Sequence, residues 1–151
     1  MFSNTKKEGK DLITILIVDN EAVNIKIAER IIRRCLANAV VHQAKSCLEA
    51  VIQAQKTIEQ DKRNYSIILM DGEMPGKNGV QTTKEIRELE NKYALQDQNK
   101  SKIFSWSSSP EYKIYEGINA SLVKDFTTDA FKELYLQQTK TKQSVNYLGN
   151  R

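Results

Sequence analysis

Short apolar runs recur along the chain at regular intervals and predict buried strands. The five runs occupy residues 13–18, 39–44, 65–70, 103–106 and 121–123. The runs 13–18 and 65–70 are apolar or β-branched at almost every position, which is typical of a strand covered on both faces, because a half-exposed strand alternates apolar and polar residues. The sequence therefore predicts a sheet that lies in the interior, with polar segments between its strands.

The segments between these runs have the pattern of one-sided helices. Residues 22–36 carry Val23, Ile27 and Ile31 at helical spacing, while the charged side chains fall largely at other positions. Ser46 and Glu49 match a capping box, which predicts the start of a second helix. Further helices are expected at residues 80–95, at 109–117 between a Ser-Pro start and a terminal glycine, and after Thr127 or Thr128 as the cap.

Strands that alternate with helices in this way predict a doubly wound α/β fold. Its five-stranded parallel sheet is covered on both faces, with right-handed crossovers. In such sheets ligands bind outside the carboxyl ends of the strands, where the strand order reverses. Five polar residues lie at or just past four of these ends: Asp19, Asn20, Asp71, Ser107 and Lys124.

Length and composition favour one globular domain. The chain has 151 residues, of which 40% are hydrophobic and 28% charged, close to the average for soluble domains. We expect a polar N-terminal segment at 1–12, the domain at 13–138 and a C-terminal tail at 139–151. No apolar run has the length of a membrane helix and the start lacks a secretory pattern, so a cytoplasmic protein is expected.

The net charge of +4 does not predict a nucleic-acid-binding protein. The basic residues are scattered, and the one dense cluster is Arg30, Arg33 and Arg34. That cluster is either a solvated helix face or a docking surface for an acidic partner. Trp106 is interpreted as a packing or surface residue, since no basic and aromatic interleaving accompanies it. The single histidine, His42, is expected to be structural or exposed.

The polar residues at the strand ends suit the acceptance of a phosphoryl group. Such a site needs an exposed carboxylate, and a cation to offset the charge of the incoming oxygens. A lysine and a hydroxyl can then hold the remaining oxygens. Taken singly, each residue has a plainer interpretation: an aspartate often forms a turn or caps a helix, and a lysine is usually solvated.

Four segments, in this order, resemble the response-regulator receiver domain. They are ILIVDNEAVN at 15–24, IILMDGEMPGKNG at 67–79, WSS at 106–108 and GINASLVK at 117–124. The likeness extends over residues 13–136, nearly the whole chain, and the Met-Asp-x-x-Met-Pro-x-x-x-Gly segment is highly specific. The resemblance implies a flavodoxin-like receiver fold in a two-component phosphorelay.

The resemblance also implies a role for each site residue. Asp71 would be the phosphoacceptor, Ser107 the switch hydroxyl and Lys124 the phosphoryl-binding lysine. Asp19, Asn20, Asp71 and the backbone carbonyl of Glu73 would hold Mg²⁺. The expected donor is a histidine kinase or a histidine phosphotransfer protein. The chain would not be an enzyme but a switch that signals through protein contacts to a downstream effector, with homodimer formation left open and no nucleic-acid or membrane partner.

Three positions depart from the family pattern. Asn20 stands at the second acidic position, which should weaken Mg²⁺ binding by removing one negative charge. Asp125 replaces the proline that usually follows the lysine; a cis bond there would cost about 3–4 kcal/mol, which leaves a trans bond as the alternative. Ser121 replaces an aromatic switch residue. These departures support one alternative function, a degenerate receiver that acts as a phosphorylation-independent interaction or dimerisation module.

Overall fold

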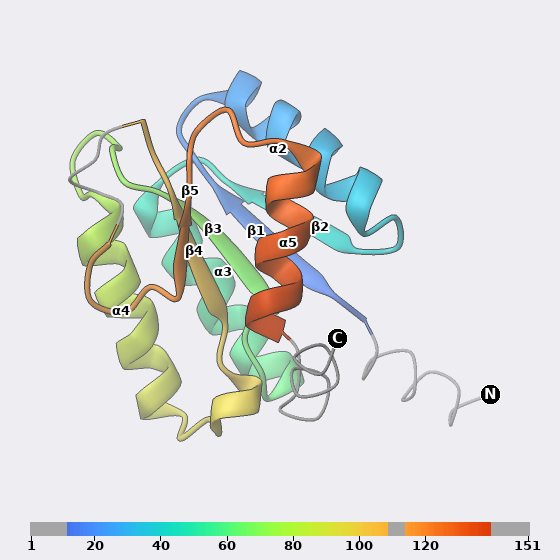
Figure 1. The fold of residues 1–151 in the computed structure, drawn as a ribbon. Helices are drawn as coiled ribbons and strands as arrows, with labels where there is room; N and C mark the ends of the chain where they lie inside the picture. The colour runs from blue at the N-terminus through green and yellow to red at the C-terminus, as the bar shows by residue number, and fades with distance from the viewer. Residues whose placement is uncertain (1–11, 109–113, 140–151) are drawn as a thin grey trace.

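The sheet has five parallel strands, which confirms the predicted fold class. A computed structural model describes residues 12–108 and 114–139. In it the strands run in the order β2-β1-β3-β4-β5, and every neighbouring pair is parallel (Figure 1). Their bounds are β1 Thr14–Val18, β2 Val40–Ala44, β3 Ile67–Asp71, β4 Lys102–Trp106 and β5 Ala120–Leu122.

Four helices cover the two faces of the sheet. Helices α2 and α5 lie on one face and α3 and α4 on the other (Figure 1). Each layer closes its own apolar core. Ile32 and Phe131 belong to the first core, and Ala54 and Ile86 to the second. The helices are α2 Ala22–Cys35, α3 Cys47–Asp61, α4 Gly79–Lys92 and α5 Thr128–Thr139, with a short 3₁₀ turn at Asp97–Asn99.

Local capping explains where several helices begin. The Ser46 hydroxyl accepts a hydrogen bond from the Glu49 backbone N–H at 3.1 Å, as the sequence predicts for the start of α3. The Thr127 hydroxyl accepts from the Ala130 N–H at 3.0 Å, so Thr127 caps α5. A complete capping box, missed in the sequence, joins Asn78 and Gln81 at the start of α4. These caps satisfy backbone donors that the first helical turn leaves unpaired.

One predicted helix is wrong in the part of it that the structure describes. Residues 114–117 form a bend and a turn instead of a helix, while residues 109–113 lie outside the described residues. Gly117 has a φ of +99°, which suits a turn. A Cβ on it would lie 2.8 Å from the Thr83 side chain, so glycine lets this turn pack closely against α4. The two expected terminal segments fall almost wholly outside the described residues.

The strand order reverses between β1 and β3, and this reversal places the candidate residues together. The chain passes from β1 to the edge strand β2 and then returns to β3 on the other side of β1. In the register, Val18 is opposite Met70, and Asp71 is opposite Trp106. The ends of β1, β3 and β4 therefore lie side by side. Within the described ranges no helix has both the length and the apolarity of a bilayer-spanning segment.

Candidate functional site

Two buried carboxylates lie at the carboxyl ends of β1 and β3. Asp19 is fully buried and Asp71 is 3% exposed. The Glu21 backbone N–H donates to Asp19 Oδ1 at 2.8 Å, and the Glu73 N–H donates to Asp71 Oδ1 at 3.2 Å. Asn24 Nδ2 adds a bond to Asp19 Oδ2 at 3.2 Å. Each carboxylate is therefore oriented by the loop that follows its own strand, as expected where aspartate ends a strand.

Lys124 lies between these two carboxylates. Its Nζ is 2.5 Å from Asp19 Oδ2 and 3.2 Å from Asp71 Oδ1. The lysine follows β5, so it reaches Asp71 across the end of β4, and Asp19 across the ends of β4 and β3. No peptide bond in the described residues is cis, so the bond between Lys124 and Asp125 is trans. The structure thus brings the predicted lysine to the predicted acceptor without the cis bond usual in the family.

Burial raises the pKa of Asp71 from its ordinary value of 3.8 to about 6. The Lys124 ammonium and the Glu73 N–H oppose this rise, whereas the negative charge of Asp19 adds to it. Removal of a carboxylate from water disfavours its charged form, and a second carboxylate nearby disfavours it further. A cation or an electrophile bound beside the two carboxylates would therefore relieve the repulsion between them.

The loop after Asp71 requires glycine at Gly79. A Cβ there would lie 2.4 Å from the backbone oxygen of Asp71 and would displace the acceptor. The Gly79 N–H also donates to the Gly72 carbonyl at 3.3 Å, which folds the loop back on the strand end. Beneath the loop, the Cys47 thiol donates to the carbonyl of Lys77. The loop that carries Glu73 is therefore fixed at both ends.

The sequence missed the part that Trp106 plays in this site. The residue is 1% exposed, which confirms that it packs in the core. Its ring also lies under Lys124, with Nζ 4.0 Å from the ring centroid, and its Nε1–H donates to the Val18 carbonyl at 3.3 Å. Its position one residue before Ser107, at a strand end in register with Asp71, is the signal that could have identified it.

The remaining predicted residues lie next to the strand ends in the sequence. Ser107 is buried directly after β4, while Asn20 and Glu73 are exposed beside Asp19 and Asp71. Within residues 12–108 and 114–139, no three His, Cys, Asp or Glu side chains gather as a metal cluster. The donors expected from the sequence are two carboxylates, a backbone carbonyl and an amide oxygen. Such an all-oxygen set would suit Mg²⁺, which keeps several waters in protein sites.

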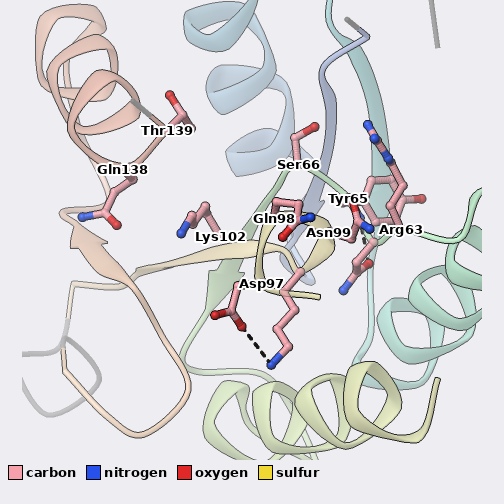
Figure 2. A pocket seen from close by; sticks show the side chains of 11 residues that line it. Arg63, Tyr65, Ser66, Asp97, Gln98, Asn99, Lys102, Gln138 and Thr139 are labelled. Atoms are coloured by element: carbon pink, nitrogen blue, oxygen red, sulfur yellow. Dashed lines mark hydrogen bonds and ion pairs between the residues drawn. The ribbon is translucent and has the colours of Figure 1, made fainter. Parts of the chain in front are cut away.

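A hollow lies at the opposite end of the sheet and takes no part in this site. It has a volume of about 350 Å³ and lies next to Ser66, which precedes β3, and Lys102, which begins β4. Figure 2 shows its lining, including Asp97, whose carboxylate is 3.4 Å from Lys100 Nζ. Because this hollow lies at the amino ends of the strands, a ligand there would not contact Asp71.

His42 and the two cysteines are not part of the candidate site. His42 is exposed on β2, with Nδ1 2.7 Å from the Tyr65 hydroxyl, so it is both exposed and part of a structural contact. Cys35 and Cys47 are free thiols. Burial raises the pKa of the Cys47 thiol, which disfavours the reactive thiolate. These residues therefore contribute packing and hydrogen bonds.

Comparison with known proteins identifies the family. The family model described as "Response regulator receiver domain" matches residues 15–135, well over half of the chain. The chain therefore belongs to the response regulator receiver domain family, which confirms the resemblance of its motifs. It is 40% identical over 81 residues to "Two-component response regulator ARR22" of Arabidopsis thaliana, covering 53% of this chain and 52% of that relative. It thus matches about half the length of this relative.

Other relatives and solved structures agree with this family. "Response regulator mcs4" of Schizosaccharomyces pombe is 34% identical over 83 residues, covering 55% of this chain and 14% of that protein. The Arabidopsis thaliana CKI1 receiver domain, solved with Mg²⁺ and BeF₃⁻, has a TM-score of 0.68 at 22% identity, covering 88% of this chain and 96% of that one. A co-crystal structure of the Saccharomyces cerevisiae histidine phosphotransfer protein Ypd1 and the receiver domain of its response regulator Ssk1 is also similar. Its TM-score is 0.65 at 23% identity, covering 83% of this chain and 87% of the matched chain. The structural matches show the shared fold.

Proposed function

We propose that this chain accepts a phosphoryl group on Asp71 from a phosphohistidine of a histidine kinase or histidine phosphotransfer protein. The observation that carries the proposal is the position of Lys124, whose Nζ bridges the buried carboxylates of Asp19 and Asp71. A cation held beside an acceptor carboxylate can bind an oxygen of the incoming phosphoryl group. Membership of the receiver family supports the same role.

Asp71 would act as the nucleophile in its ionised form. One of its carboxylate oxygens forms a bond to phosphorus while the P–N bond of the phosphohistidine breaks, and the electron pair of that bond returns to the imidazole nitrogen. With a pKa of about 6, Asp71 is mostly ionised at pH 7.5. Lys124 and the hydroxyl of Ser107 would each bind one phosphoryl oxygen in the product.

We further propose Mg²⁺ as the cofactor. Asp19, Asp71 and the backbone carbonyl of Glu73 would hold the ion, with Asn20 beside them at the end of β1. When bound, the ion offsets negative charge on the phosphoryl oxygens. The neutral side chain of Asn20 makes the affinity lower than an aspartate there would give. The CKI1 receiver domain, a structural neighbour, has been solved with Mg²⁺.

A histidine phosphotransfer protein and a downstream effector are the partners that we propose. The Ypd1 and Ssk1 complex is a phosphotransfer protein bound to a receiver domain, and it supports a partner of that class for this chain. Phosphorylation would shift a conformational equilibrium in the segments around Ser107 and Lys124, and so change the affinity for a downstream effector protein. The chain would then act as a switch and not as an enzyme with its own substrate turnover.

Intact-mass spectrometry after incubation with acetyl phosphate tests the proposal. The wild-type protein should gain one phosphoryl group when Mg²⁺ is present and much less when it is chelated. Asp71→Asn should gain none, while the exposed-site control Asp125→Asn should behave as the wild type. No adduct on the wild type with acetyl phosphate or with a phosphorylated phosphotransfer protein would favour the phosphorylation-independent interaction module instead.

A further inference from the structure

Trp106 contacts three residues at or beside the site. Its ring face lies 4.0 Å from Lys124 Nζ, and its Nε1–H donates to the carbonyl of Val18, the residue before Asp19. On another side it packs edge-on against Phe126, with ring centroids 6.1 Å apart. The indole is therefore fixed by a hydrogen bond and a ring contact, so it cannot rotate away from the lysine without breaking both.

We propose that Trp106 is a positioning residue, whose ring holds the Lys124 ammonium between Asp19 and Asp71. The proposal rests on the proposed function, since it concerns the reaction in which Lys124 binds the phosphoryl group. Two carboxylate contacts alone leave a flexible four-carbon side chain free to approach them from several directions. The ring supplies a third contact, which fixes the ammonium over one face of the indole.

The physical basis is the attraction between a cation and the negative face of an aromatic ring. Such contacts contribute more when water is excluded, and indole is the strongest of the protein rings. Trp106 is fully buried, and the Lys124 side chain is only 23% exposed. The attraction does not depend on the carboxylates. It therefore persists when the ammonium shares its donors with an incoming phosphoryl oxygen, and the lysine stays in place through the reaction.

Fluorinated tryptophan tests the contact at nearly constant shape. Trp106 is the only tryptophan in the chain, so feeding the expression host a fluorinated analogue changes this ring alone. Each added fluorine makes the ring face less negative. The rate of phosphorylation by acetyl phosphate with Mg²⁺ should fall stepwise from no fluorine to one and then to several, while circular dichroism shows an unchanged fold.

Substitution of the ring gives the second measurement. Trp106→Phe keeps an aromatic face but loses the N–H to Val18, whereas Trp106→Leu keeps only apolar bulk. We expect Trp106→Leu to slow phosphorylation about 2- to 30-fold, the range that cation–π contacts of about 0.5–2 kcal/mol imply at 1.36 kcal/mol per factor of ten. Trp106→Phe should retain most of the rate. A rate that also falls with fluorine number would exclude a mere loss of packing.

The outcomes separate the two proposals. Equal rates across the fluorinated series, or equally slow Phe and Leu variants, would overturn the positioning role of Trp106 and leave Asp71 as the acceptor. A wild-type protein that takes no phosphoryl group would overturn the proposed function, and the role of Trp106 with it. A graded series together with a Phe rate above the Leu rate would establish that the ring acts through the Lys124 ammonium.

Discussion

Replacing Asp71 with asparagine should stabilise the metal-free protein at neutral pH, because the buried ionised carboxylate of Asp71 lowers its stability. The pKa of this group is raised from 3.8 to about 6 in the folded protein. A carboxyl group with a raised folded pKa contributes stability below pH 3.8, where it is protonated in both states. That contribution is lost as the pH rises through 6.

The difference of about two pH units corresponds to about 3 kcal/mol of unfolding free energy, as an order of magnitude. Between pH 4 and 6 the folded state binds more protons at Asp71 than the unfolded state, so the stability of the wild type falls as the pH increases. Asparagine has a similar shape and carries no charge. Asp71→Asn should therefore be more stable than the wild type by up to about 3 kcal/mol at pH 7.5, and about equal to it at pH 4.

Urea denaturation with chelator at pH 4, 5, 6 and 7.5 measures this difference. Asp125→Asn is the matched control, because it removes an exposed carboxylate near the site and should change stability by less than about 0.5 kcal/mol at every pH. The reasoning fails if Asp71→Asn is no more stable than the wild type at pH 7.5. It also fails if the gain is the same at pH 5 and pH 7.5, because the gain would then not come from ionisation.

Three further predictions concern the metal, the loop and the scaffold. Asn20→Asp should raise Mg²⁺ affinity roughly tenfold by isothermal titration calorimetry, since it adds a negative charge beside the site; unchanged affinity would remove Asn20 from the metal site. Gly79→Ala should slow phosphorylation because its Cβ meets the acceptor's backbone; a wild-type rate would show that the loop accommodates the added methyl group. Arg87→Met should cost about 3–5 kcal/mol in urea denaturation, because it removes the ion pair of the fully buried Glu90 and leaves its charge with the neutral donors Asn64 Nδ2 and the Ser101 N–H. Adding Glu90→Gln should recover part of this, and no recovery would argue against the charge as the cause.

The buried strands could be predicted from the sequence because both faces of each strand pack in the apolar interior, which gives a nearly continuous apolar run. The run that ends at Asp71 is buried throughout in the structure, as its apolar pattern indicates. The fourth strand begins one residue earlier than predicted, at the polar Lys102. A strand end at the surface accepts such a residue, so hydrophobic pattern alone does not locate it. The turn at 114–117 was missed because proline and glycine mark turns as well as helix ends.

The candidate site was predictable as a set of residues but not as a set of contacts. Strand-end position was enough to select Asp19, Asp71 and Lys124, since carboxyl ends meet at one edge of a parallel sheet. The bridging geometry of Lys124 depends on side-chain directions that periodicity does not encode. Trp106 was assigned to packing or to the surface because no basic and aromatic interleaving accompanies it. Its contact with Lys124 arises only when β4 and the segment after β5 are brought together.

The most direct test of the central claim is to locate the phosphoryl group on the chain. Borohydride reduction after reaction with acetyl phosphate and Mg²⁺ converts an aspartyl phosphate to homoserine, which peptide mass spectrometry assigns to a position. The account predicts homoserine at position 71 in the wild type, lost when Mg²⁺ is chelated. Homoserine at the position of another aspartate would contradict the account. Complete absence of homoserine after prolonged incubation with a competent phosphodonor would contradict it as well.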